Sequence, residues 1–301
     1  MVTLPAAAVP LYLRATRANR SFVTAAGARK RVRQRELRPL RYGPPRRLRG
    51  DVTVGVIRSH EWPVYTVAPR TGTPVGSVVY LHGGGWVGEI APQHWTLAAQ
   101  IAAEANTTVV VPIYPLIPFG TAAEVVAGVV DLVLESRRLY GDACLGGDSA
   151  GGQIALSAAL RLRDDHGVVV PRTVLISPAL DLTWGNPRIP EVQPTDPWLA
   201  TPGGKVFAGL WAGDLDLLHP DVSPLSGDLA GLGAITLFTG TRDVLNPDAR
   251  LLVGKARDAG VELDVHERVG DLHVFPLLPI RSGREARAAI VSDLARAMSL
   301  G

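Results

Sequence analysis

Gly147-Asp148-Ser149-Ala150-Gly151 is the stretch of sequence that decides the fold. It lies between a short apolar run, Ala143–Gly146, and an alanine-rich segment of helical character, Gly151–Arg163. A serine with glycine two positions before and after it is typical of a very tight strand-to-helix turn, because side chains at those two places would clash. Such a turn holds the serine in a strained backbone conformation that costs about 1–3 kcal/mol. The pattern predicts a serine hydroxyl raised clear of a sheet edge, beside a helix N-terminus that favours negative charge.

A second glycine-rich stretch, His82-Gly83-Gly84-Gly85, directly follows the apolar run Val78–Leu81. Consecutive glycines leave backbone N–H groups unshielded, so that they can approach a ligand closely. If the serine attacks a carbonyl group, negative charge develops on the carbonyl oxygen, and each donor aimed at it is worth roughly 2.7–4 kcal/mol. The N–H groups of Gly84, Gly85 and Ala150 form the predicted oxyanion hole. A flexible loop or a phosphate-binding nest would explain this stretch alone, but not its pairing with the serine turn.

Short β-rich runs alternate with helical segments from about Asp51 onward. The predicted strands are Val52–Ile57, Tyr65–Ala68, Val78–Leu81, Thr108–Tyr114, Ala143–Gly146, Thr173–Ile176, Ile235–Thr239 and Leu263–Val269. The predicted helices are Ala91–Ala105, Thr121–Leu139, Gly151–Arg163, Pro247–Ala259 and Gly283–Met298. Strands that alternate with helices of this length predict an α/β fold, in which helices cover both faces of a mostly parallel sheet.

A serine nucleophile needs a base, and in hydrolases with this turn the chain order is serine, acid, histidine. His273 follows the last predicted strand in a loop that can reach across the sheet edge. His266 lies within that strand, where its side chain would be fixed on a sheet face. His273 is therefore the predicted base.

The predicted acid is Asp243, whose role is to orient the histidine and stabilise its cation. It follows the strand Ile235–Thr239, at the strand end where α/β sheets build their sites. Asp248 is the close competitor, although a carboxylate in the first turn of a helix is favourable without any catalytic role. Asp271 stays open as a further alternative.

Taken together, His82-Gly83-Gly84-Gly85, Gly147-Asp148-Ser149-Ala150-Gly151-Gly152, Asp243 and His273 resemble the hormone-sensitive-lipase-like family of bacterial esterases, over roughly residues 50–300. The resemblance implies an α/β-hydrolase fold with an eight-stranded sheet and a mobile helical cap. It also implies hydrolysis of short- to medium-chain acyl esters without a cofactor or metal, with Gly84 and Gly85 in the oxyanion hole. One segment, residues 114–119, departs from the family pattern because it lacks an arginine and a glutamate that many relatives carry, which removes the basis for an ion pair there.

Two segments are predicted to cover the site. An insertion at about residues 183–225, in a proline-rich stretch without a clear strand, is longer than an ordinary loop and typical of a lid. Residues 1–50 form a basic N-terminal arm with 13 Arg or Lys and one acid, and this arm is predicted to complete the cap over a catalytic domain of residues 51–301. The candidates for an acyl pocket, each with core packing as the alternative, are Trp86, Trp198, Phe207 and Trp211.

The charge of the arm bears on partners and location. The run Arg29-Lys30-Arg31-Val32-Arg33-Gln34-Arg35 suits a solvated helical face, with contact to an anionic membrane surface as the alternative. Nucleic acid is not an expected partner, because no aromatic stripe or zinc-ligand spacing accompanies the run. Cys144 is the single cysteine, and the first residues show no secretory pattern, so a cytoplasmic location is expected. Peripheral membrane or cell-wall association and a homodimer stay open.

The predicted function is that of a serine carboxylesterase, which hydrolyses a small acyl-ester substrate through a covalent acyl-enzyme. One alternative is a non-catalytic small-molecule receptor on the same fold, against which the presence of His273 argues. The other is a deacetylase, lactonase or amidase that uses the same triad.

Overall fold

The computed structural model describes residues 3–38 and 40–299. Its frame is an eight-stranded sheet with the strand order β1-β2-β4-β3-β5-β6-β7-β8. The strands are β1 (Val52–Ser59), β2 (Trp62–Pro69), β3 (Ser77–Leu81), β4 (Thr108–Pro112), β5 (Ala143–Asp148), β6 (Arg172–Ile176), β7 (Ala234–Arg242) and β8 (Leu263–Leu272). β2 is antiparallel to both of its neighbours, and the strands from β4 to β8 in the sheet order are parallel. The predicted eight-stranded, mostly parallel sheet is confirmed.

Two strand ends differ from the sequence prediction. β4 ends at Pro112 rather than at Tyr114. The Ile113 N–H still donates to the Pro63 carbonyl at 2.8 Å, but Pro63 of β2 has no N–H to return the bond. β8 continues to Leu272 rather than ending at Val269, since Arg242 pairs with Leu272 after an irregularity in the β7–β8 register. This extension carries the chain directly to His273.

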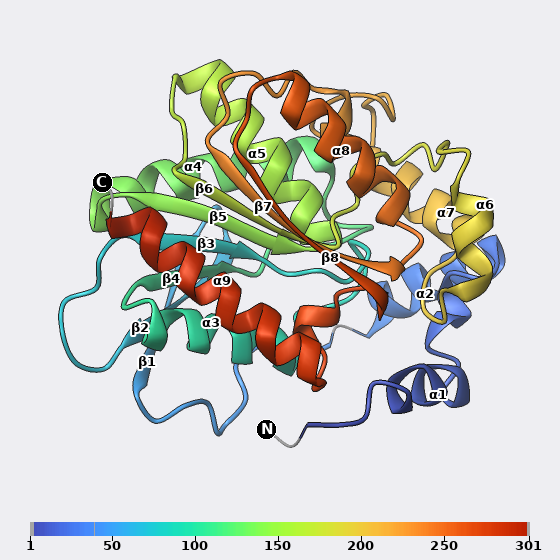
Figure 1. The fold of residues 1–301 in the computed structure, drawn as a ribbon, viewed down its shortest axis with the longest axis horizontal. Coiled ribbons are helices and arrows are strands. Elements are labelled where there is room, and N and C mark those ends of the chain that lie inside the picture. Colours follow the sequence, from blue (N-terminus) through green and yellow to red (C-terminus); the bar gives the residue numbers. More distant parts are fainter. Residues whose placement is uncertain (1–2, 39, 300–301) are drawn as a thin grey trace.

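Helices cover both faces of the sheet, as Figure 1 shows. One face carries α4 (Ala122–Tyr140), α5 (Ala150–His166) and α8 (Asn246–Asp258), and the other carries α3 (Pro92–Glu104) and α9 (Arg281–Ser299). Two separate clusters of buried apolar side chains fill the two interfaces. A continuous apolar strand is what burial on both faces requires.

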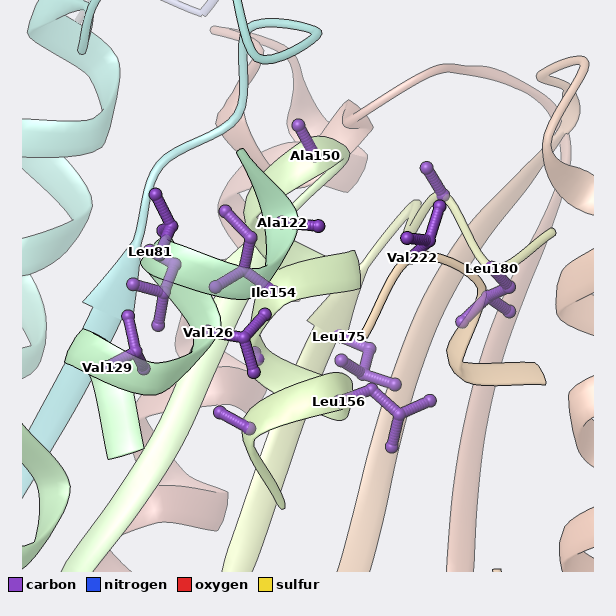
Figure 2. Packing of buried hydrophobic residues seen from close by; sticks show 14 of the residues in the cluster. Leu81, Ala122, Val126, Val129, Ala150, Ile154, Leu156, Leu175, Leu180 and Val222 are labelled. Carbon is purple, nitrogen blue, oxygen red and sulfur yellow. The ribbon is translucent and has the colours of Figure 1, made fainter. Parts of the chain in front are cut away.

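Strand β3 shows how one short strand serves both clusters. Val79 and Leu81 belong to the cluster beneath α4 and α5, whereas Val78 and Tyr80 belong to the cluster beneath α3 and α9. Successive side chains of a strand point to opposite faces, so the two sets alternate. Figure 2 shows the first cluster, in which side chains of β3, α4 and α5 meet around Ile154.

The remaining helices lie together at the end of the sheet where the strands terminate (right in Figure 1). They are α1 (Ala8–Ala15), α2 (Ala25–Leu37), α6 (Ile189–Val192) and α7 (Thr201–Ala212). The first two precede β1, and the last two belong to the insertion between β6 and β7. A 3-10 turn at Ala18–Ser21 lies between α1 and α2, one at Gln193–Thr195 lies between α6 and α7, and a third at Pro224–Ser226 follows α7. The Gly203 N–H donates to the Phe22 carbonyl at 2.7 Å, and a Cβ on Gly203 would lie 2.5 Å from Phe22 Cα. The N-terminal segment and the insertion are therefore in close backbone contact.

Candidate active site

Four of the residues singled out in the sequence come directly after the carboxyl ends of parallel strands. His82 follows β3, Ser149 follows β5, Asp243 follows β7, and His273 follows β8. Because parallel strands end at the same edge of the sheet, residues far apart in sequence converge there.

Ser149, His273 and Asp243 form a continuous hydrogen-bonded chain. Ser149 Oγ lies 3.0 Å from His273 Nε2, and His273 Nδ1 lies 2.8 Å from Asp243 Oδ2. All three residues are buried, with 8%, 4% and 0% of their surfaces exposed. The carboxylate of Asp243 can only accept, so Nδ1 carries the proton in the neutral ring and Nε2 accepts from the serine hydroxyl. The predicted nucleophile, base and orienting acid are thus within hydrogen-bonding distance of one another.

The competing residues lie elsewhere. Asp248, in the first turn of α8, accepts a hydrogen bond from Asn186 Nδ2 at 2.7 Å, and burial raises the pKa of its carboxyl to about 6. His266 stacks on Phe238 with ring centroids 4.4 Å apart, on the sheet face where its position in β8 predicts it. Asp271 is not the partner of His273 Nδ1, which bonds to Asp243.

The turn that carries Ser149 is strained and closely packed. Ser149 has φ 53° and ψ −116°, a combination that L-residues seldom adopt. A Cβ on Gly147 would lie 2.3 Å from the Gly151 carbonyl oxygen, and one on Gly151 would lie 2.0 Å from the Leu81 carbonyl oxygen. Both glycines are therefore required by backbone atoms that have no room to move.

Gly151→Ala is expected to lower the free energy of unfolding by about 3 kcal/mol, because the new methyl group overlaps a backbone carbonyl. Gly254→Ala is the matched control: the residue lies inside α8, and a Cβ there meets nothing within 4 Å. The control is expected to stabilise the protein by about 0.5–1 kcal/mol, through reduced freedom of the unfolded chain. Urea unfolding curves of the two variants measure both effects, and equal midpoints would contradict the packing argument.

Asp148, a residue that the sequence reasoning passed over, holds the glycine-rich loop against the serine turn. Its Oδ1 accepts from Tyr80 Oη at 2.8 Å and from the Gly83 N–H at 2.9 Å. Its Oδ2 lies 3.2 Å from Nε2 of His94, whose Nδ1 accepts from the Ala91 N–H. Burial opposes the charge of Asp148, but His94 and the hydrogen bonds outweigh it and lower the pKa of the carboxyl. An acidic residue at the end of a buried strand is the signal that could have predicted such partners.

Residues 114–117 also form hydrogen bonds with the loop that begins at His82. Tyr114 Oη donates to the His82 carbonyl, and the Ile117 N–H donates to the Trp86 carbonyl at 2.9 Å. The segment that departs from the family pattern therefore still supports this loop. Within the loop, the Gly84 carbonyl accepts from the Gly88 N–H at 2.8 Å, which folds residues 84–88 into a turn beside the serine.

Asp196, also missed by the sequence reasoning, joins the insertion to the loop of Asp243. Its Oδ1 accepts from the N–H groups of Trp198 and Leu199 at 2.7 and 3.0 Å, and its Oδ2 accepts from the Val244 N–H at 2.9 Å. Burial, together with the charge of Asp243, raises the pKa of Asp196 to about 6.

A cavity of about 640 Å³ opens over the serine. Gly84, Gly85, Ser149 and His273 line it together with residues of the N-terminal segment and Trp198. Trp198 meets the His273 ring edge-on, with centroids 5.8 Å apart.

The other three aromatic candidates for an acyl pocket are not among the residues that line this cavity. Trp86 and Trp211 are buried and stacked, and both indole N–H groups donate to Gln153 Oε1, at 3.1 and 2.9 Å. Phe207 is fully buried and packs edge-on against Phe22. Trp86, Trp211 and Phe207 therefore pack in the core and do not line an acyl pocket in this structure.

Across residues 3–38 and 40–299, no helix is long and apolar enough to cross a membrane. Over the same described residues, no group of three or more His, Cys, Asp or Glu side chains could hold a metal ion.

Comparisons with known proteins agree with this fold. A family model described as alpha/beta hydrolase fold matches residues 78–277. An acetyl-hydrolase of Streptomyces hygroscopicus is 31% identical over 217 residues, which cover 70% of this chain and 72% of that protein. A crystal structure of a mutant of the esterase E40 is 25% identical, with a TM-score of 0.81 and coverage of 99% and 100%. An esterase of the bacterial hormone-sensitive lipase family has the same fold, with a TM-score of 0.82, 24% identity and coverage of 99% and 100%.

Proposed function

Because this chain belongs to the alpha/beta hydrolase fold family and is a carboxylic ester hydrolase, we propose that it hydrolyses short-chain acyl esters through a triad of Ser149, His273 and Asp243. The single observation that carries the proposal is the hydrogen-bonded chain from Ser149 Oγ through His273 to Asp243, at 3.0 and 2.8 Å. The preference for short chains is supported by the acetyl-hydrolase among the relatives.

The proposed reaction proceeds in two acyl transfers. His273 Nε2 removes the proton from Ser149 Oγ as the oxygen attacks the ester carbonyl, and the N–H groups of Gly84, Gly85 and Ala150 bind the oxyanion. His273 then protonates the leaving alcohol, which leaves an acyl group on Ser149. A water molecule, deprotonated by the same ring, releases the acid and restores the serine. Asp243 keeps Nδ1 protonated throughout and stabilises the imidazolium.

A panel of p-nitrophenyl esters from acetyl to palmitoyl tests the chain-length part of the proposal. We expect kcat/KM to be highest for the acetyl to butyryl esters, and a maximum at long chains would contradict it. Labelling by a fluorophosphonate probe separates an enzyme from a receptor on the same fold, because only an activated serine reacts. An unlabelled, folded protein would favour the receptor.

The pH dependence follows from His273, which must be neutral to accept the serine proton. Burial of the ring disfavours its cation, but the charge of Asp243 and the hydrogen bond to it outweigh burial and raise the pKa of His273 above its ordinary value of 6.5. As the pH falls through this raised pKa, the ring becomes protonated and activity is lost. We expect kcat/KM for p-nitrophenyl acetate to fall about tenfold per pH unit below a midpoint above pH 6.5. The same midpoint should be found with p-nitrophenyl butyrate, and a midpoint below about pH 6 would contradict the assignment.

A further inference from the structure

The catalytic cavity has a cationic wall. Among the residues that line it, the N-terminal segment contributes four basic side chains, which are Arg17, Arg20, Lys30 and Arg31. Helix α2 supplies two of them on one face, since Gly27, Lys30, Arg31 and Gln34 all line the cavity at spacings of three and four residues. Ala28 and Val32 form the buried stripe of the same helix. The run of basic residues noted in the sequence thus has an inner face, over the serine, and an outer face.

These four cations differ from most of the charged side chains around them in their ion pairing. In the part of the chain that the structure describes, none of them forms an ion pair within 4.0 Å. Arg35, farther along α2, differs because it pairs with the buried Glu89. Asp148 is the one carboxylate among the described residues that line the cavity, and its oxygens are already bonded to Tyr80, Gly83 and His94.

Partial burial makes it less favourable for these basic side chains to stay charged without an anionic partner. Arg31 is half-buried, and burial, followed by the charges of Arg20 and Arg35, lowers the pKa of its guanidinium. The same cavity is lined by apolar side chains, which are Phe22, Trp198, Leu199 and Leu277. Walls of low polarity focus the field of nearby charges into a cleft. An anion in this cavity would replace lost hydration and relieve the repulsion among the arginines.

We propose that the preferred substrate is a small ester that carries a second, anionic group, a carboxylate, sulfate or phosphate. Arg20, Lys30 and Arg31 bind this anion, while the ester carbonyl lies at Ser149 between the base and the oxyanion hole. The inference rests on the proposed function and specifies its substrate class. A soluble anion fits better than a membrane surface, because these side chains line the catalytic cavity, whereas Arg29 and Arg33 on the outer face of α2 do not.

Two pairs of esters matched in carbon-chain length test the proposal with the wild-type protein. Monoethyl adipate and ethyl hexanoate differ by a carboxylate on the acyl side, and 6-acetoxyhexanoate and hexyl acetate differ by one on the alcohol side. We expect one of the anionic esters to exceed its neutral partner in kcat/KM by roughly tenfold, the equivalent of one charge-assisted hydrogen bond. The excess should shrink as sodium chloride is raised from about 0.02 M to 0.5 M, because salt screens the attraction.

Substitutions then assign the preference to the wall. Arg31→Gln and Arg20→Gln are each expected to lower the ratio of anionic to neutral kcat/KM roughly fivefold, and Arg31→Lys, which keeps the charge, is expected to retain most of it. Arg29→Gln and Arg33→Gln are the matched controls. They remove the same charge from exposed positions of the same helix and are expected to leave the ratio unchanged. Arg20 is itself exposed, so its variant reports on the charge even if Arg31→Gln does not fold.

The preference for an anionic ester and the proposed ester hydrolysis can fail independently. Hydrolysis of the neutral esters with no preference for either anionic partner overturns the inference alone. No hydrolysis of any ester by folded protein overturns the proposed function as well. Equal losses of the ratio in the variants and the controls would show a general effect of net charge and refute the binding role of the wall. Competition by anionic phospholipid vesicles, but not by free adipate, would assign the cations to a membrane surface instead.

Discussion

Ser149→Ala is expected to lower kcat for hydrolysis of p-nitrophenyl acetate by about 10⁶-fold. The substitution removes the oxygen that is proposed to form the acyl-enzyme, while the proposed oxyanion hole at Gly84 and Gly85 is left intact. A small residual rate above the uncatalysed reaction is therefore expected, because oxyanion binding survives. The rate is measured with enzyme freed of wild-type contamination, and the burst of p-nitrophenol that reports acylation should disappear.

Folding of this variant is checked separately. Alanine accepts the strained φ of 53° no better and no worse than serine, so the thermal midpoint should change little. Ser292→Ala, an exposed position on α9, is the matched control and should keep full activity. A folded Ser149→Ala protein with an unchanged kcat would refute the nucleophile.

Asp243→Asn is expected to lower kcat by about 10⁴-fold. The amide can donate to His273 Nδ1, which favours the tautomer whose proton is on Nε2. That nitrogen then cannot accept from Ser149 Oγ, although the geometry is preserved. Asp196 is not expected to replace the lost carboxylate, because the N–H groups of Trp198, Leu199 and Val244 hold it in a position where it forms no hydrogen bond with His273.

Asp248→Asn is the control that separates the two candidate acids. Its carboxyl faces Asn186 rather than the histidine, so a loss of less than about tenfold in kcat is expected. If Asp248→Asn lost as much activity as we expect of Asp243→Asn, while Asp243→Asn stayed active, the acid would be wrongly assigned. The comparison uses p-nitrophenyl acetate at a pH on the alkaline plateau of the wild-type kcat/KM profile.

The sheet and the serine turn could be predicted from the sequence because their signals are local. A glycine pattern between an apolar run and a helix is explained by contacts within the turn itself, such as Gly147 against Gly151. The alternation of strands and helices predicts a parallel sheet, and the order of a parallel sheet brings strand ends together. The proposed triad residues follow from that placement, since Asp243 and His273 are each the first residue after a strand.

What could not be predicted depends on partners far apart in the sequence. Trp86 and Trp211 are residue types common in acyl pockets, but both indole N–H groups donate to the buried amide oxygen of Gln153, and the two side chains are part of the core. The supports at Asp148 and Asp196 depend on donors brought in by other elements. A buried acid indicates that such donors exist, but the local sequence does not identify which residues they are. The end of β8 at Leu272 also depends on a distant partner, because its last pairing is made with Arg242 of the neighbouring strand.

The carboxylate of Asp196 limits how this enzyme could be re-engineered. Chimeras that transplant the segment between β6 and β7 from a relative would change the cavity wall at Trp198 and Leu199. A graft that replaces Asp196 with a residue lacking a carboxylate would lose the hydrogen bond from the Val244 N–H. A graft that has an aspartate at position 196 keeps the hydrogen bonds that join the insertion to the loop of Asp243. The boundary for such swaps is therefore set by one buried acid rather than by the visible ends of the helices.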